Sequence, residues 1–163
     1  MTESGPPPSG GSESFFPQST ILIVDDNPQN VELLAAFLES LPVKIVTASD
    51  GIEALRKVSE HSPDLILLDI MMPHMSGFQV CQRIKSDPKT RDIQILMVTA
   101  LNELGDIERA TECGTDDFVS KPVNKFELHT RVKSLLKVRH LKSELERALT
   151  YLNEMEQDAP ETE

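Results

Sequence analysis

The stretch LILLDIMMP, residues 65–73, is the most informative part of this sequence. Its first four residues are apolar without alternation, which is typical of a strand buried on both faces in a parallel sheet covered by helices. Two further runs have the same character, ILIV at 21–24 and ILMV at 95–98. Each of the three runs is followed directly by a polar residue, which is Asp25, Asp69 or Thr99.

The rest of the central region alternates short apolar runs with longer amphipathic segments. Strands are predicted over residues 20–24, 43–48, 65–69, 93–99 and 117–120, and helices over about 27–40, 50–60, 76–86, 103–113 and from 125 onward. Asn27 and Pro28 form a cap followed by proline at the first helical position, and Gly114 stands where a left-handed helix end is expected. This order predicts an α/β fold, a doubly wound five-stranded parallel sheet with five helices, the last extended beyond the domain.

The polar residues at the predicted strand ends suggest a functional site. In a doubly wound sheet the ligand crevice lies outside the carboxyl ends of the strands. Asp25 and Asp26 follow the first strand, Asp69 and Thr99 end the third and fourth, and Lys121-Pro122 follows the fifth. Crowded carboxylates repel one another, so the pKa of at least one should rise, and a hard cation such as Mg²⁺ fits the ligand types. The set suits phosphoryl transfer, although the sequence has no GxxxxGK[ST] loop for a nucleotide.

These residues and spacings resemble the receiver domain of two-component response regulators, over roughly residues 20–138. The resemblance implies the flavodoxin-like receiver fold, with Asp69 as phosphoacceptor and Mg²⁺ held by Asp25, Asp26, Asp69 and the Met71 carbonyl. It also implies Thr99 and Lys121 as partners of the phosphoryl group, Thr99 and Phe118 as the switch pair, and a cis peptide before Pro122.

The function implied by this resemblance is that of a phosphorylation-switched response regulator. A sensor histidine kinase or phosphotransfer protein would phosphorylate Asp69, which alters the face near Phe118 to control a partner or dimerisation. The chain is then no enzyme beyond catalysing its own phosphoryl transfer and dephosphorylation. The dephosphorylation is expected to be slow, because Met71 and Leu101 offer no group to orient a water. Two alternatives are an Asp-nucleophile hydrolase of similar fold, disfavoured because Met71 stands where such enzymes need an acid, and a degenerate scaffold receiver.

Composition restricts the partners and the compartment. The formal net charge of −11 disfavours direct binding to nucleic acid or to membrane surfaces, since both are anionic. No apolar run approaches the roughly 20 residues of a membrane span, and the first residues lack the features of a secretory signal. The two cysteines form no disulfide framework, and the four histidines, treated as surface residues, lack metal-ligand spacing. A cytoplasmic location is therefore predicted.

Two flanking regions differ from the predicted receiver. Residues 1–19 are rich in Pro, Gly and Ser and are predicted to be a disordered arm, and residues 139–163 to be a coiled-coil-like helical extension with an acidic tail. Apolar residues recur at alternating spacings of three and four, as in a heptad seam: Val138, Leu141, Leu145, Ala148, Leu152 and Met155. This pattern favours a parallel homodimer through residues 138–155. The alternatives are a helix that folds back on its own domain or one that is ordered by an output domain outside this chain.

Overall fold

The computed structural model describes residues 19–100 and 104–158. It consists of β1 (Ser19–Val24), α1 (Pro28–Leu38), β2 (Val43–Ala48), α2 (Gly51–His61), β3 (Leu65–Asp69), α3 (Gly77–Ser86), β4 (Gln94–Thr99), α4 (Leu104–Cys113), β5 (Asp117–Ser120) and α5 (Lys125–Asp158). The predicted order is confirmed, and no predicted boundary is shifted by more than two residues. The predicted arm and acidic tail lie outside the described residues except for Ser19, which begins β1, and Asp158, which ends α5.

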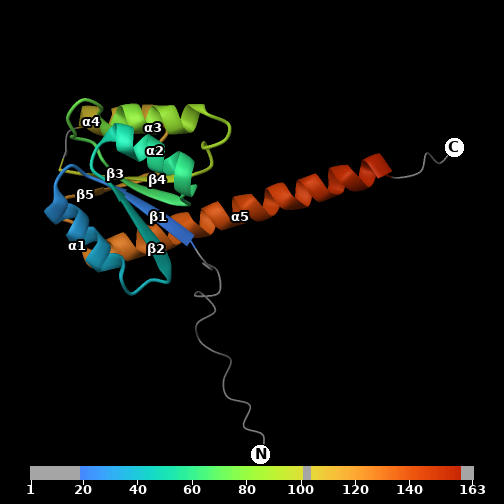
Figure 1. Cartoon of the computed structure of the whole chain (residues 1–163), viewed down its shortest axis with the longest axis horizontal. Helices are drawn as coiled ribbons and strands as arrows, with labels where there is room; N and C mark the ends of the chain where they lie inside the picture. Colours follow the sequence, from blue (N-terminus) through green and yellow to red (C-terminus); the bar gives the residue numbers. More distant parts are fainter. Residues whose placement is uncertain (1–18, 101–103, 159–163) are drawn as a thin grey trace, which may run out of the picture.

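The five strands form one parallel sheet in the order β2-β1-β3-β4-β5. Helices α1 and α5 lie on one face, and α2, α3 and α4 on the other (Figure 1). Every residue of β3 and of β4 is buried, which explains why these strands read as continuous apolar runs. The doubly wound α/β fold predicted from the sequence is therefore confirmed.

Local signals fix where the helices begin and end. The Asn27 side chain accepts from the Gln29 N–H, with Pro28 in the first turn, and the Asp50 side chain accepts from Glu53. Ser76 and Gln79 form a reciprocal capping box at α3. Gly114 follows α4 with φ of +90°, the left-handed conformation that glycine adopts without penalty.

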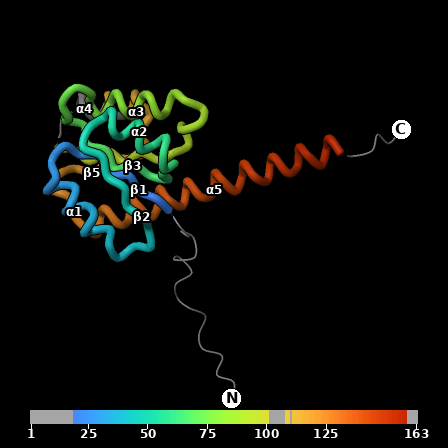
Figure 2. The backbone as a smooth tube through the Cα atoms, viewed as in Figure 1, coloured from blue at the N-terminus to red at the C-terminus, as the bar shows by residue number. Residues whose placement is uncertain are grey.

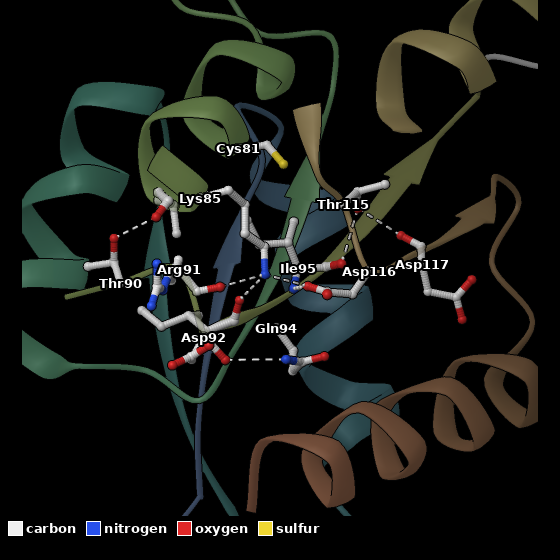
Figure 3. Close-up of polar contacts among 12 residues, drawn as sticks. Cys81, Lys85, Thr90, Arg91, Asp92, Gln94, Ile95, Thr115, Asp116 and Asp117 are labelled. Carbon is white, nitrogen blue, oxygen red and sulfur yellow. Dashed lines mark hydrogen bonds and ion pairs between the residues drawn. The ribbon is translucent and has the colours of Figure 1, made fainter. Parts of the chain in front are cut away.

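A polar cluster fixes the amino-terminal edge of β4 to α3 and to the segment before β5 (Figure 3). The Lys85 ammonium donates to the carbonyls of Arg91 and Ile93 at 3.0 and 2.7 Å and pairs with Asp116 at 2.8 Å. The same Asp116 carboxylate accepts from the Ile95 main-chain N–H at 2.7 Å. This cluster lies at the edge of the sheet opposite to the carboxyl ends, so it contributes to the fold rather than to the crevice.

Helix α5 is one continuous helix of 34 residues. Its first part packs against the sheet through buried residues, which are Leu128, Val132, Leu135 and Leu136. Beyond them it runs out of the domain as a straight rod (Figure 2). At the point of exit, the Arg139 guanidinium pairs with Asp64, which directly precedes β3, at 3.5 Å. The helix therefore leaves at the amino-terminal edge of the sheet.

Candidate functional site

Three carboxylates meet at the carboxyl edge of the sheet. Asp25 directly follows β1, Asp69 ends β3, and the two strands are neighbours in the sheet. One oxygen each of Asp25, Asp26 and Asp69 lies within 4.8 Å of the others. Asp25 and Asp69 are buried, at 2% and 6% exposure, while Asp26 is exposed. The predicted acidic cluster therefore exists, and Asp26 is its solvent-exposed member.

Lys121 supplies a positive charge to this cluster. Its ammonium donates to a carboxylate oxygen of Asp25 at 3.3 Å and lies 3.6 Å from Asp69 Oδ1. The peptide bond between Lys121 and Pro122 is cis, as the resemblance implied. With three carboxylates against one ammonium, the cluster keeps an excess of negative charge when all four groups are ionised. A bound cation would offset this excess.

The surroundings of the Asp69 carboxyl group raise its pKa. Burial raises the pKa of Asp69 to about 6, and the Asp25 carboxylate raises it as well, while Lys121 acts in the opposite direction. The Met71 N–H donates to Asp69 Oδ1 at 3.4 Å, which is a long hydrogen bond. The prediction that crowding raises at least one pKa is thus confirmed, although burial is the largest cause.

The loop after β3 passes very close to α3. A Cβ atom on Gly77 would lie 2.3 Å from the Asp69 carbonyl oxygen and 2.8 Å from Ile70 Cα. The Gly77 N–H donates to the Ile70 carbonyl at 2.9 Å. Only glycine permits this approach, so Gly77 contributes to the placement of Asp69 although the sequence pattern did not single it out.

Thr99 and Phe118 lie on the neighbouring strands β4 and β5. Thr99 is buried at the carboxyl end of β4, and its carbonyl accepts from the Lys121 N–H at 2.8 Å. The Phe118 side chain is 37% exposed. Met71 is 65% exposed beside the cluster, and Leu101 lies outside the described residues. All the residues assigned to the metal and phosphoryl sites are thus placed at one edge of the sheet.

A groove of about 280 Å³ lies beside the cluster, between α1 and α2, and neither Asp69 nor Lys121 lines it. Four acidic residues contribute carboxylates to its wall, which are Asp25, Asp26, Glu32 and Glu53. Any anion entering this groove meets several negative charges. The carboxylate oxygens suit a hard divalent cation, and such a cation would also offset the negative charge of this groove.

Comparison with known proteins identifies the family. A family profile described as "Response regulator receiver domain" matches residues 21–133. This chain belongs to the response regulator receiver domain family. The five-stranded sheet, the acidic cluster and Lys121 all belong to or border the segment that matches this family.

Relatives of this receiver domain occur in longer regulators. The chain is 44% identical over 125 residues to the response regulator PleD of Caulobacter vibrioides, covering 77% of this chain and 28% of that protein. It is 41% identical over 117 residues to the alkaline phosphatase synthesis transcriptional regulatory protein PhoP of Bacillus subtilis, covering 72% and 48%. The chain thus spans less than half the length of these two relatives.

Solved receiver domains share the fold. One is the signal receiver domain of a histidine kinase from Syntrophus aciditrophicus, with a TM-score of 0.69 and 39% identity, covering 72% of this chain and 89% of that one. Another is the receiver domain of the sensor histidine kinase PA1611 from Pseudomonas aeruginosa, with a TM-score of 0.68 and 30% identity, covering 73% and 98%. That structure has a magnesium ion coordinated in its active site cleft.

Two predictions outside the site are changed or extended by the structure. His129, predicted to be a surface residue, is half-buried, and its Nε2 contacts the carbonyl of Phe37 because α1 and α5 pack side by side. Cys81 is buried in the core, and Cys113 is partly buried against it. Among the residues that the structure describes, no helix is both long and apolar enough to cross a membrane.

Proposed function

We propose that this chain is a phosphorylation-switched receiver whose phosphoacceptor is Asp69. The observation that supports this best is the buried Asp69 carboxylate beside Asp25, with the Lys121 ammonium close to both. A sensor histidine kinase or a phosphotransfer protein is the proposed donor. A cytoplasmic location, without direct binding to nucleic acid, is part of the same proposal.

In the transfer step, an oxygen of ionised Asp69 attacks the phosphorus of a phosphohistidine. The new O–P bond gives an acyl phosphate, and the breaking P–N bond returns its electron pair to the imidazole, which takes up a proton. Lys121 balances negative charge on the transferred oxygens. Asp25, Asp26, Asp69 and the Met71 carbonyl would hold Mg²⁺, which when bound supplies further positive charge there.

The phosphorylated state is proposed to act through β4 and β5. The phosphoryl group adds roughly −1.5 to −2 charge and three acceptor oxygens. The Thr99 hydroxyl moves toward these oxygens, and the exposed Phe118 side chain turns into the space that Thr99 leaves. Controlled self-association through residues 138–155 of α5 is the proposed output, and the chain catalyses only its own phosphorylation and a slow dephosphorylation.

The test combines a small phosphodonor such as acetyl phosphate with Mg²⁺ and intact-mass measurement. The wild type should gain the mass of one phosphoryl group, and Asp69→Asn should gain none. Asp92→Asn, at the opposite edge of the sheet, is the matched control and should behave as wild type. Rapid turnover of the donor would instead support a hydrolase, and an unchanged mass would support a scaffold without phosphorylation.

A further inference from the structure

The part of α5 beyond the sheet carries a continuous apolar stripe that no described residue covers. We define the seam as Val138, Leu141, Leu145, Ala148, Leu152 and Met155. All six are exposed, and the five larger ones expose between 37% and 60% of their surface. Their spacing alternates between three and four residues along one unbroken helix, which matches the a and d positions of a coiled coil.

The seam points away from the domain that carries it. With 3.6 residues per turn, its mean direction lies roughly 150° around α5 from the residues that pack on the sheet, such as Leu128 and Val132. The helix contains no break between Lys125 and Asp158 that would allow it to fold back. The described residues of the same copy therefore leave the seam uncovered.

Charges along the extension are separated by sign. Residues 137–142 contain Lys137, Arg139 and Lys142 and no acid. Residues 144–158 contain five acids, which are Glu144, Glu146, Glu154, Glu156 and Asp158, against the single base Arg147. A second copy of the chain presents charges of the opposite sign only when it runs in the opposite direction.

We propose that two copies of this chain pair through the seam as an antiparallel coiled coil. This inference rests on the proposed dimer and replaces the parallel arrangement that the heptad spacing favoured before the charges beside the seam were considered. In the register that we propose, Val138 lies against the partner's Met155 and Leu141 against the partner's Leu152. Leu145 lies against the partner's Ala148, so a large side chain meets a small one in both central layers.

The flanking positions favour the same direction. In the antiparallel register Lys137 lies beside the partner's Asp158, and this attractive pair occurs twice by symmetry. In a parallel coil Lys137 would instead lie beside the partner's Lys142, a repulsive pair that also occurs twice. Parallel pairing would further place Ala148 against the partner's Ala148 and leave that layer underfilled.

This arrangement separates the two receivers. They lie at opposite ends of the paired segment, which spans about 30 Å for some 20 residues. The carboxyl end of each α5 reaches the root of the other, where Arg139 pairs with Asp64. Each receiver therefore contacts its partner at the amino-terminal edge of the sheet, far from its own Asp69.

Disulfide cross-linking of full-length variants tests the direction. Leu141→Cys and Leu152→Cys proteins are each oxidised mildly alone and after mixing, with wild type as the control for Cys81 and Cys113. The antiparallel register predicts cross-linked dimers only in the mixture. Like residues at position 141 would be about 16 Å apart along the axis, too far for a disulfide.

Sedimentation of the unoxidised proteins separates this inference from the proposed dimer. The wild type should dimerise, and Leu145→Asp/Leu152→Asp should stay monomeric. Cross-linking of Leu141→Cys alone would establish a parallel coil and overturn the antiparallel proposal. A dimer without either cross-link would show that another face mediates it, and a monomeric wild type would remove the dimer itself.

Discussion

The ammonium of Lys121 lies 3.3 Å from a carboxylate oxygen of Asp25, closer than the 3.6 Å that separates it from Asp69. The single Lys121 ammonium therefore pairs with two buried carboxylates. Its position between them is the basis of the role proposed for Lys121, to balance the charge of a phosphoryl group on Asp69.

Replacing Lys121 by Met should slow phosphorylation of Asp69 by about 100-fold, because one preorganised cation at the transferred group is lost. Lys121→Arg keeps the positive charge and should reduce the phosphorylation rate much less. The measurement is the rate of mass gain with a small phosphodonor and Mg²⁺. An unchanged rate in the Met variant would show that Lys121 does not act on the phosphoryl group.

Asp69→Asn should stabilise the metal-free protein at pH 8. The pKa of Asp69 is raised by burial to about 6 from an ordinary value of 3.8. Ionisation therefore costs native-state stability progressively as the pH rises from about 4 to 6, and the cost is complete above that range. Removing the charge should raise the free energy of unfolding by roughly 1–3 kcal/mol at pH 8 and by almost nothing at pH 4.

Urea unfolding with a chelator present, at both pH values, measures this difference. Asp92→Asn should show no comparable gain. Equal stability of wild type and Asp69→Asn at pH 8 would contradict the raised pKa.

Most of the fold could be predicted because the three central strands are buried on both faces and therefore read as uninterrupted apolar runs. The crevice followed from the rule that ligands bind at carboxyl ends, which brought Asp25, Asp69 and Lys121 together from positions far apart in the sequence. The Lys85 cluster could not be predicted, because its partners are mainly backbone carbonyls that no side-chain pattern reveals. The half-buried position of His129 likewise depends on how α1 and α5 pack.

Lys85→Met should lower the free energy of unfolding by about 1–3 kcal/mol. The substitution keeps the aliphatic stem but removes the donor to two carbonyls and the counter-charge of Asp116, whose carboxylate keeps only the Ile95 N–H among these partners. Lys89→Met, an exposed site on the same side of the domain, should change stability by less than about 0.5 kcal/mol. Equal effects of the two variants in urea unfolding would show that the cluster contributes little.

Cys113 should be the more reactive of the two thiols. The hydrogen bond from the Cys81 side chain and the main-chain N–H of Thr115 lower the pKa of Cys113 to about 7 against partial burial, while the same pairing and burial raise the pKa of Cys81. Alkylation followed by mass spectrometry should give one fast adduct with half-maximal rate near pH 7. Cys113→Ser should lose that adduct, and a midpoint near the pH of an ordinary thiol would contradict the lowered pKa.

The separated charges of α5 give a test of the dimer that needs no cross-link. Lys137→Asp should weaken dimerisation roughly five-fold, because two exposed ion pairs become two repulsive ones. The swap Lys137→Asp/Asp158→Lys should restore the affinity at low salt. Sedimentation at low and high ionic strength measures both, and a swap that fails to restore affinity would exclude the proposed register.

The unbroken course of α5 has a mechanical consequence. The residues that anchor it to the sheet and those that form the seam belong to one rod without a hinge, so the receiver end cannot tilt or rotate independently of the exposed end. Met155 lies about 28 Å along the axis from Leu136, and a 5° tilt at the sheet would displace it by about 2.5 Å. Such a lever converts a small repacking beneath α5 into a sideways displacement of the exposed end, about half of the roughly 5 Å that separates successive layers of a coiled coil.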